Sequence, residues 1–129
     1  MIQFHLERSG VPAYLQLVQQ VRQAIRLGVL RPGDQLPTVK EVVGTLTINP
    51  NTVLRAYRQL DLEGLIEGRR GVGTFVAEDA TPPPPDELKD LRSALQRWLT
   101  RARAAGLDDL AIATLFSDTL RPPSVSRVA

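Results

Sequence analysis

The chain lacks the residues on which several common chemistries depend. It contains no cysteine, which excludes disulfides, thiolate catalysis and cysteine-ligated zinc and fits a reducing compartment. A single imidazole, His5, without clustered carboxylates predicts neither a metal site nor a catalytic site. No apolar run is long enough to span a bilayer, and no signal-peptide core follows Met1. We therefore expect a cytoplasmic protein with no membrane contact and no cofactor.

What the chain does contain is typical of a folded domain with an uneven charge. Its 129 residues are 43% hydrophobic and 23% charged, as in globular proteins and unlike disordered tails. Residues 1–77 carry nine Lys/Arg against six Asp/Glu, a net charge of +3, whereas residues 78–129 carry seven against eight, a net charge of −1. This modest basic excess permits an anionic partner without requiring one.

Residues 48–61 predict a short helix with two unlike faces. Apolar residues at i, i+3, i+4 and i+7 form the inward face: Val53, Ala56, Tyr57 and Leu60. Polar and guanidinium groups form the outward face: Asn51, Arg55 and Arg58, with Thr52 and Leu54 at its edges. Asn49 suits the N-cap and Pro50 the first helical position, at the end of the helix that usually meets base edges. The alternative is an ordinary solvated face, and the neighbouring segments decide between the two.

Two further helices are predicted before this one. Pro12 introduces the first and Gly28 closes it, with an apolar stripe between them. The stripe consists of Tyr14, Leu17, Val18, Val21, Ala24 and Ile25. Thr38 and Glu41 form a capping box for the second helix, which should end within residues 44–47. Two short helices joined by a tight turn predict a helix-turn-helix.

A β-hairpin is predicted after the third helix, from segments 65–69 and 73–77. Its tip is basic and rich in glycine. Arg69 and Arg70 suit a narrow, electronegative minor groove, and Gly71 permits positive φ and close approach of the backbone to a ligand. Turn geometry alone would also explain a glycine here. Together with the preceding helices, the hairpin predicts the wing of a winged helix-turn-helix.

The C-terminal part predicts a linker followed by two amphipathic helices. Four consecutive prolines within residues 78–87 favour a stiff polyproline spacer, with a ligand for proline-recognition domains as the alternative. Asp86 can cap the first helix and Gly106 ends it, and the second helix should stop before Pro122. Two helices of about thirty residues cannot bury their apolar surface alone, so we expect dimerisation. The expected dimer residues are Leu88, Leu91, Leu95, Trp98, Leu99, Leu110, Leu115 and Phe116.

The predicted fold is mainly α with a small β-hairpin: a winged helix-turn-helix followed by a two-helix dimerisation tail. We expect a DNA-binding domain over residues 1–77, an acidic, proline-rich linker over 78–87, the dimerisation region over 88–121 and a flexible C-terminus over 122–129. Residues 2–6 alternate in polarity and predict either a short strand or an apolar arm on the core.

Residues 12–76 resemble the DNA-binding domain of GntR-family bacterial transcription regulators. The resemblance rests on several runs: Pro-Gly-Asp-Gln-Leu-Pro (32–37), Asn-Pro-Asn-Thr-Val (49–53), Arg-Ala-Tyr (55–57), Glu-Gly-Leu-Ile (63–66) and Arg-Arg-Gly-Val-Gly-Thr-Phe-Val (69–76). The second of these runs, followed by a short tail, resembles the YtrA-type subfamily. In that subfamily the tail is a pair of dimerising helices and the regulated genes often encode ABC transporters. The resemblance implies a homodimeric repressor that binds a palindromic double-stranded DNA operator.

The resemblance transfers to individual residues only where they match. Lys40 stands where the family commonly has an arginine that meets DNA, and a lysine loses bidentate recognition of guanine. Many relatives have arginines at the positions of Pro50 and Leu54, so no base code is transferred. Arg70 and Gly71 match the wing-tip positions that enter the minor groove. The full expected DNA-contact set is Thr38, Lys40, Asn49, Asn51, Thr52, Arg55, Arg58, Arg69, Arg70 and Gly71.

Two other functions compete with this interpretation. One is a winged-helix module that binds protein or RNA. Tight binding to a palindromic duplex with strong salt dependence would separate duplex-DNA binding from it, because neutralised phosphates release counterions. The other is an enzyme fragment, since related regulators carry a fused aminotransferase-like domain. No Ser/His/Asp set, phosphate loop or metal-ligand spacing supports it, so we expect no catalytic activity. The tail is shorter than the ligand-binding domains of larger relatives, so an effector would have to bind in the dimer interface or between tail and winged domain.

Overall fold

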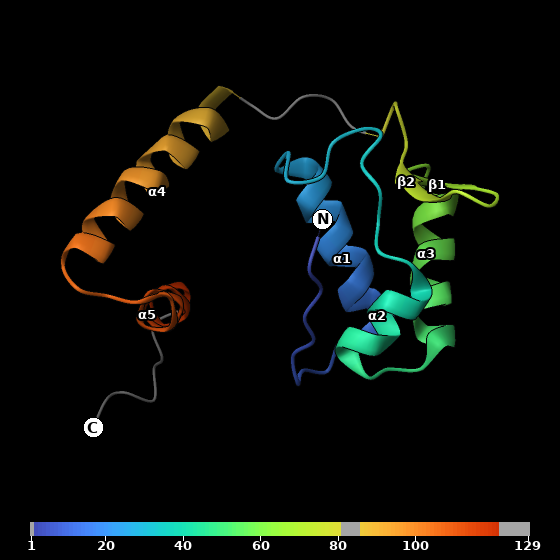
Figure 1. The fold of residues 1–129 in the computed structure, drawn as a ribbon, viewed down its shortest axis with the longest axis horizontal. Helices are drawn as coiled ribbons and strands as arrows, with labels where there is room; N and C mark the ends of the chain where they lie inside the picture. The colour runs from blue at the N-terminus through green and yellow to red at the C-terminus, as the bar shows by residue number, and fades with distance from the viewer. Residues whose placement is uncertain (1, 81–85, 122–129) are drawn as a thin grey trace. The chain divides into compact units, whose positions relative to one another are not determined.

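The computed structural model describes residues 2–80 and 86–121 and separates the chain into two compact units, Met1–Pro84 and Pro85–Ala129. The first contains α1 (Ala13–Arg26), α2 (Val39–Leu46), α3 (Pro50–Leu62), β1 (Ile66–Arg69) and β2 (Gly73–Val76), and the second contains α4 (Asp86–Ala104) and α5 (Asp109–Leu120) (Figure 1). The fold is thus mainly helical with one small hairpin, as predicted. The predicted polyproline stretch and flexible C-terminus lie largely outside the described residues.

Side-chain caps that the sequence predicts set the starts of α2 and α3. The Glu41 N–H donates to Thr38 Oγ1 over 3.1 Å and the Thr38 N–H to Glu41 Oε1 over 3.3 Å, which completes the predicted capping box of α2. Asn49 Oδ1 accepts from the Asn51 N–H over 2.8 Å, and Pro50 is the first residue of α3. These caps satisfy backbone donors that have no partner inside the helices.

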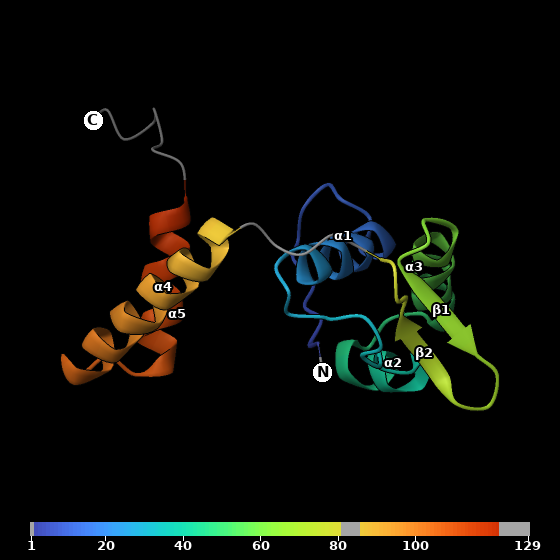
Figure 2. The same ribbon diagram turned by 90° about the horizontal axis from the view of Figure 1, so that it is seen from above.

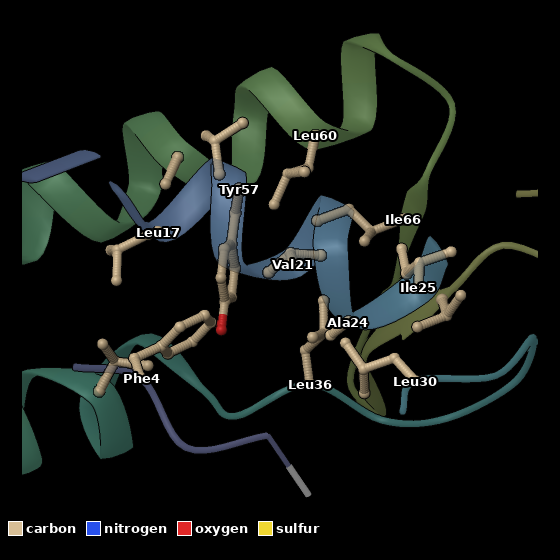
Figure 3. Packing of buried hydrophobic residues seen from close by; sticks show 14 of the residues in the cluster. Phe4, Leu17, Val21, Ala24, Ile25, Leu30, Leu36, Tyr57, Leu60 and Ile66 are labelled. Atoms are coloured by element: carbon tan, nitrogen blue, oxygen red, sulfur yellow. The ribbon is translucent and has the colours of Figure 1, made fainter. Parts of the chain in front are cut away.

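The core of the first unit forms where α3 packs on α1. The predicted apolar stripe of α3 is buried throughout: Val53, Ala56, Tyr57 and Leu60. It meets the buried stripe of α1, which contains Leu17, Val18, Val21, Ala24 and Ile25 (Figure 3). Each such aliphatic side chain stabilises the fold by about 1.5 to 3 kcal/mol through burial. The inward face predicted for α3 is confirmed.

The hairpin β1–β2 is antiparallel and pairs Ile66 with Val76 and Arg69 with Gly73. An extended segment from the α1–α2 connection, which the sequence did not predict, lies along β2. The Gly33 N–H donates to Val76 O over 2.9 Å, the Val76 N–H to Asp34 O over 2.8 Å, and the Leu36 N–H to Thr74 O over 2.8 Å. The wing is therefore hydrogen-bonded to the connection that leads into α2; Figure 2 shows the course of both segments.

Residues 2–6 form an arm on the core rather than a strand. Phe4 is buried in the core. The Gln20 side chain accepts from the His5 N–H over 3.1 Å and donates to His5 O over 2.6 Å, and the Gln16 side chain makes the same pair of bonds with Glu7 over 2.9 and 3.0 Å. Each amide bonds both backbone groups of one residue, as a neighbouring strand would.

The second unit is a helical hairpin with little buried surface. Gly106, with φ of 95°, follows α4. Asp108 caps α5, since its Oδ1 accepts from the Ala111 N–H over 2.8 Å. Of its described residues, only Ala102 and Ile112 are buried. In the part of the chain that the structure describes, no helix is both long and apolar enough to cross a membrane.

Candidate nucleic-acid interface

The exposed half of α3 is bounded by contacts on two sides. Starting from Tyr57 and turning about 100° per residue, Leu54 lies about 60° away, Arg58 about 100°, Asn51 about 120° and Arg55 about 160°. All four of these side chains are exposed. The buried stripe lies on the opposite side, and the half-buried Thr52 and Gln59 lie between it and Arg55. The two ends of this arc are Tyr57 and Arg55, and each contacts a different part of the fold.

These two contacts show which neighbouring helix lies at each edge of the exposed arc. The Tyr57 hydroxyl donates to Pro37 O over 2.5 Å, just before the first residue of the α2 capping box. The Arg55 guanidinium stacks over the ring of Tyr14 in α1, 3.8 Å from its centroid. The arc therefore runs from an α2 edge at Tyr57 to an α1 edge at Arg55. In a helix-turn-helix the first helix crosses the DNA backbone, so the α2 edge is the side of α3 from which we expect DNA to approach.

The two predicted base-reading arginines differ in their surroundings. Arg58 lies in the middle of the exposed arc and forms no ion pair with any described residue. Arg55 already has a partner in Tyr14, and leaving it would cost about 0.5 to 1 kcal/mol for a cation–π contact at an exposed site. Lys40 is exposed on the first turn of α2. Arg58 and Lys40 are therefore the cations most available on this surface.

The capping residues are partly committed to backbone hydrogen bonds. Thr38 Oγ1 accepts from Glu41 and Asn49 Oδ1 accepts from Asn51, which leaves the Thr38 O–H and the Asn49 amide N–H groups able to donate. Thr52 is half-buried beside α1 on the wheel, further from the α2 edge than Asn51. The side chains that cap α2 and α3 can therefore each donate to an approaching phosphate.

The wing likewise contains one arginine with side-chain contacts and one without an ion pair among the described residues. Arg69 lies 4.4 Å from the centroid of the Phe75 ring and bonds Glu67 Oε1 over 3.1 Å. Arg70 is exposed and forms no ion pair within residues 2–80 or 86–121. Gly71, at φ of 76°, takes the left-handed conformation that the tip requires. Of the two adjacent arginines, Arg70 is the one at the turn with no competing contact.

A residue that sequence reasoning missed supports the wing. Gln35 lies against Gly73, where an added Cβ would be 2.6 Å from Gln35 Nε2, and Gly73 has φ of 144°. A Cβ at this position would require Gln35 to move, and the positive φ would strain a larger residue even then. Tyr14 and Phe75, the aromatic partners of the two held arginines, were also missed. No local pattern signals these contacts, because each partner lies on a different element or strand position from its arginine.

An ion pair joins α1 to the end of α3. Arg22 Nε and Nη2 donate to the two carboxylate oxygens of Glu63 over 2.7 and 2.5 Å, and the Gln59 side chain donates to Glu63 over 2.9 Å. The hydrogen bonds from Arg22 hold the pKa of Glu63 below its ordinary value. The same pair raises the pKa of Arg22. With Arg55 stacked on Tyr14, α3 is fixed to α1 near its middle and at its C-terminal end.

Across residues 2–80 and 86–121, no group of three or more His, Cys, Asp or Glu side chains could hold a metal ion. The features present are a capped helix-turn-helix, an outward arc with a guanidinium and an amide, and a hairpin with an arginine at its tip. Together they define a winged helix-turn-helix protein of the DNA-binding class.

Comparison with known proteins identifies the family. The model described as "Bacterial regulatory proteins, gntR family" matches residues 13–76. The chain is 37% identical over 102 residues to the HTH-type transcriptional repressor YtrA of Bacillus subtilis, covering 78% of each chain. The chain belongs to the GntR family and is similar to its YtrA-type members, as the sequence motifs predicted. Regulators of this family are DNA-binding transcription factors and not enzymes.

Solved structures show the same fold. YtrA from Sulfolobus acidocaldarius, a GntR-family transcription factor, superposes with a TM-score of 0.51 at 29% identity, covering 92% of this chain and 96% of that one. AraR(DBD) in complex with operator ORX1 gives a TM-score of 0.50 at 28% identity, covering 60% of this chain and 93% of the other. The second shows that a relative of this fold binds operator DNA.

Proposed function

We propose that the protein is a cytoplasmic transcriptional repressor that binds a palindromic operator as a homodimer. The observation that carries the proposal is the exposed arc of α3, in which Arg58 and Asn51 face outward beside the α2 edge. These groups can bond base edges in a major groove, because guanidinium and carboxamide groups make bidentate bonds to guanine and adenine. The proposed target, an ABC transporter operon, rests on the similarity to YtrA-type regulators.

The expected DNA contacts divide into two kinds. Base edges would be read by Arg58 and Asn51, and the minor groove by Arg70 and Gly71. Phosphates would be bound by a wider set: Thr38, Lys40, Asn49, Thr52 and Arg69. Arg55 belongs in this account to the α1 edge, where it holds α3 against Tyr14 rather than reading a base.

The dimer is supported by apolar surface that the second unit leaves exposed. Leu91 is 65% exposed and Leu110 77% exposed. Five further large apolar side chains are exposed: Leu95, Trp98, Leu115, Phe116 and Leu120. Leu88 and Leu99 are half-buried beside them on α4. Contiguous apolar surface of this kind marks an interaction site, and a second copy supplies a self-complementary partner.

A binding experiment tests the DNA contacts. Duplexes bound by the full chain are selected from random sequence, and affinity for the recovered operator is measured by fluorescence anisotropy at several salt concentrations. We expect an inverted repeat with half-site centres about 34 Å apart and affinity that falls steeply with salt. Arg58→Ala should cost about 1 to 3 kcal/mol of specific binding, and Arg55→Ala should cost less. Equal affinity for operator and random duplex would reject the proposal.

A matched pair of tail variants tests the dimer. Leu95→Glu places a charge in the apolar stripe of α4, and Gln96→Glu places the same charge on the neighbouring exposed position. Sedimentation should show a dimer for the wild-type chain and for Gln96→Glu, and a monomer with far weaker operator binding for Leu95→Glu. A wild-type chain that stays monomeric at micromolar concentration would remove the dimer from the proposal.

A further inference from the structure

We propose that Leu54 reads the 5-methyl group of a thymine in each half-site of the operator. The inference rests on the proposed function, because it requires α3 to enter a major groove. It adds a specificity-determining residue of a different chemistry from the guanidinium and amide groups beside it. The contact would be apolar and would select thymine over cytosine at one base pair.

The position of Leu54 carries the first step. Its side chain is 43% exposed, although it lies on the first half of a helix whose apolar stripe is otherwise buried. On the helix it stands about 60° from Tyr57, at the α2 edge of the exposed arc. Residues three and four positions away are its neighbours on the helix, and the exposed ones are Pro50, Asn51 and Arg58. Leu54 thus lies among the groups expected to face base edges.

The contacts of the other residues support the same orientation. Tyr57 turns one side of α3 toward Pro37 and the start of α2, while Arg55 turns the opposite side toward Tyr14 in α1. Because DNA approaches from the α2 edge, Leu54 meets it before Arg55 does. Leu62 is still more exposed, at 79%, but it is the last residue of α3 and lies two turns beyond Leu54. Exposure alone therefore does not select Leu54, whereas its position does.

The chemistry of the major groove limits what Leu54 can recognise. Every base edge there presents hydrogen-bond donors or acceptors, and only thymine also presents a methyl group. A leucine has no polar atom, so it can favour thymine by burying that methyl and disfavour bases whose polar groups it would cover without a bond. Burying one such carbon contributes about 0.8 kcal/mol, which is about a four-fold change in affinity.

Uracil substitution isolates this contact, because uracil differs from thymine only by the missing methyl group. Each thymine of one operator half-site is replaced in turn, and full-length wild-type, Leu54→Ala and Leu62→Ala chains are titrated against every duplex. We expect one position at which uracil weakens wild-type binding about four-fold and leaves Leu54→Ala binding unchanged. Leu62→Ala, the same truncation on the same helix, should respond to uracil as the wild type does.

The outcomes separate this inference from the proposed function. If the wild-type chain binds its operator but no uracil effect disappears in Leu54→Ala, the inference is wrong and the proposed function stands. If Leu62→Ala loses the same uracil effect, Leu54 is not the reader. If no duplex is bound specifically, both fail. Circular dichroism and thermal melting of Leu54→Ala, whose side chain lies outside the core cluster, should match the wild type and confirm that the variant folds.

Discussion

Tyr57→Phe removes one hydroxyl group from the point where the recognition helix meets the start of α2. The ring of Tyr57 is buried in the core (Figure 3). Its hydroxyl donates to the carbonyl oxygen of Pro37, itself a buried residue. Phenylalanine fills the same space but leaves that carbonyl without its donor. We expect a loss of about 1 to 3 kcal/mol in the free energy of unfolding. For a unit of this size the melting temperature should fall by at least about 4 °C.

The same variant should also change the response to alkaline pH. Burial, and then the charge of Glu41, raise the pKa of Tyr57 above its ordinary value of about 10. Below that value the contribution of Tyr57 is complete. Above that value Tyr57 ionises in the unfolded chain but keeps its proton in the folded chain. The free energy of unfolding therefore falls as pH rises toward the raised folded pKa, by at most about 1.4 kcal/mol per pH unit. The phenylalanine variant has no such loss, so the gap between the two proteins should close within about one to two units above pH 10.

The measurement is urea unfolding, followed by circular dichroism at one protein concentration, at pH 7 and at steps above pH 10. Tyr14→Phe is the matched control. Its hydroxyl has no hydrogen-bond partner among the described residues, and its ring remains available to Arg55. The control should stay within about 0.5 kcal/mol of the wild type. A gap for Tyr57→Phe that is absent at pH 7, or that persists unchanged through pH 11, would refute the role given to this hydroxyl.

Three further predictions concern stability. Hydrogen bonds from Arg22 hold the pKa of Glu63 low, so its contribution is complete above the ordinary carboxyl pKa near 4.3 and is lost as pH falls through the lowered value. In chemical denaturation Glu63→Gln should be about 0.5 kcal/mol less stable than the wild type at pH 7, a small difference because solvent screens the exposed Arg22. In strong acid the two proteins should be equally stable, and a difference that stays constant with pH would contradict this. Thr38→Ala should lower the free energy of unfolding by about 1 kcal/mol because the helix cap is lost, whereas Thr38→Ser keeps the hydroxyl and should not. If the two variants have the same melting temperature, Thr38 does not act as a cap. Phe4→Ala should lower the free energy of unfolding in urea by about 3 kcal/mol. The control is His5→Ala at the exposed neighbouring position, and an equally small loss for both variants would show that the arm is not part of the core.

The parts of the fold that the sequence predicts are those set by neighbouring residues. The caps at Thr38 and Asn49 and the apolar stripe of α3 depend on residues within one or two turns, so their patterns can be read directly. The extended segment at Gly33 that pairs with β2 depends on a partner far along the chain. So does the arm, whose backbone bonds to glutamines of α1. Periodicity carries no information about such partners, which explains why residues 2–6 stayed undecided between strand and arm.

The candidate interface also depends on contacts that the sequence pattern does not reveal. In each of two pairs of arginines, one member is stacked on an aromatic ring and the other is not. The helical wheel places Arg55 and Arg58 on one outward face, and the sequence places Arg69 and Arg70 side by side at the wing. In each pair one arginine stacks on an aromatic ring, Arg55 on Tyr14 and Arg69 on Phe75. The other extends without an ion pair to any described residue. A stacked guanidinium keeps its in-plane N–H donors, but the ring restrains its position, so we expect the aromatic partners, together with the positions of the charges, to decide which arginine of each pair can move into a DNA groove.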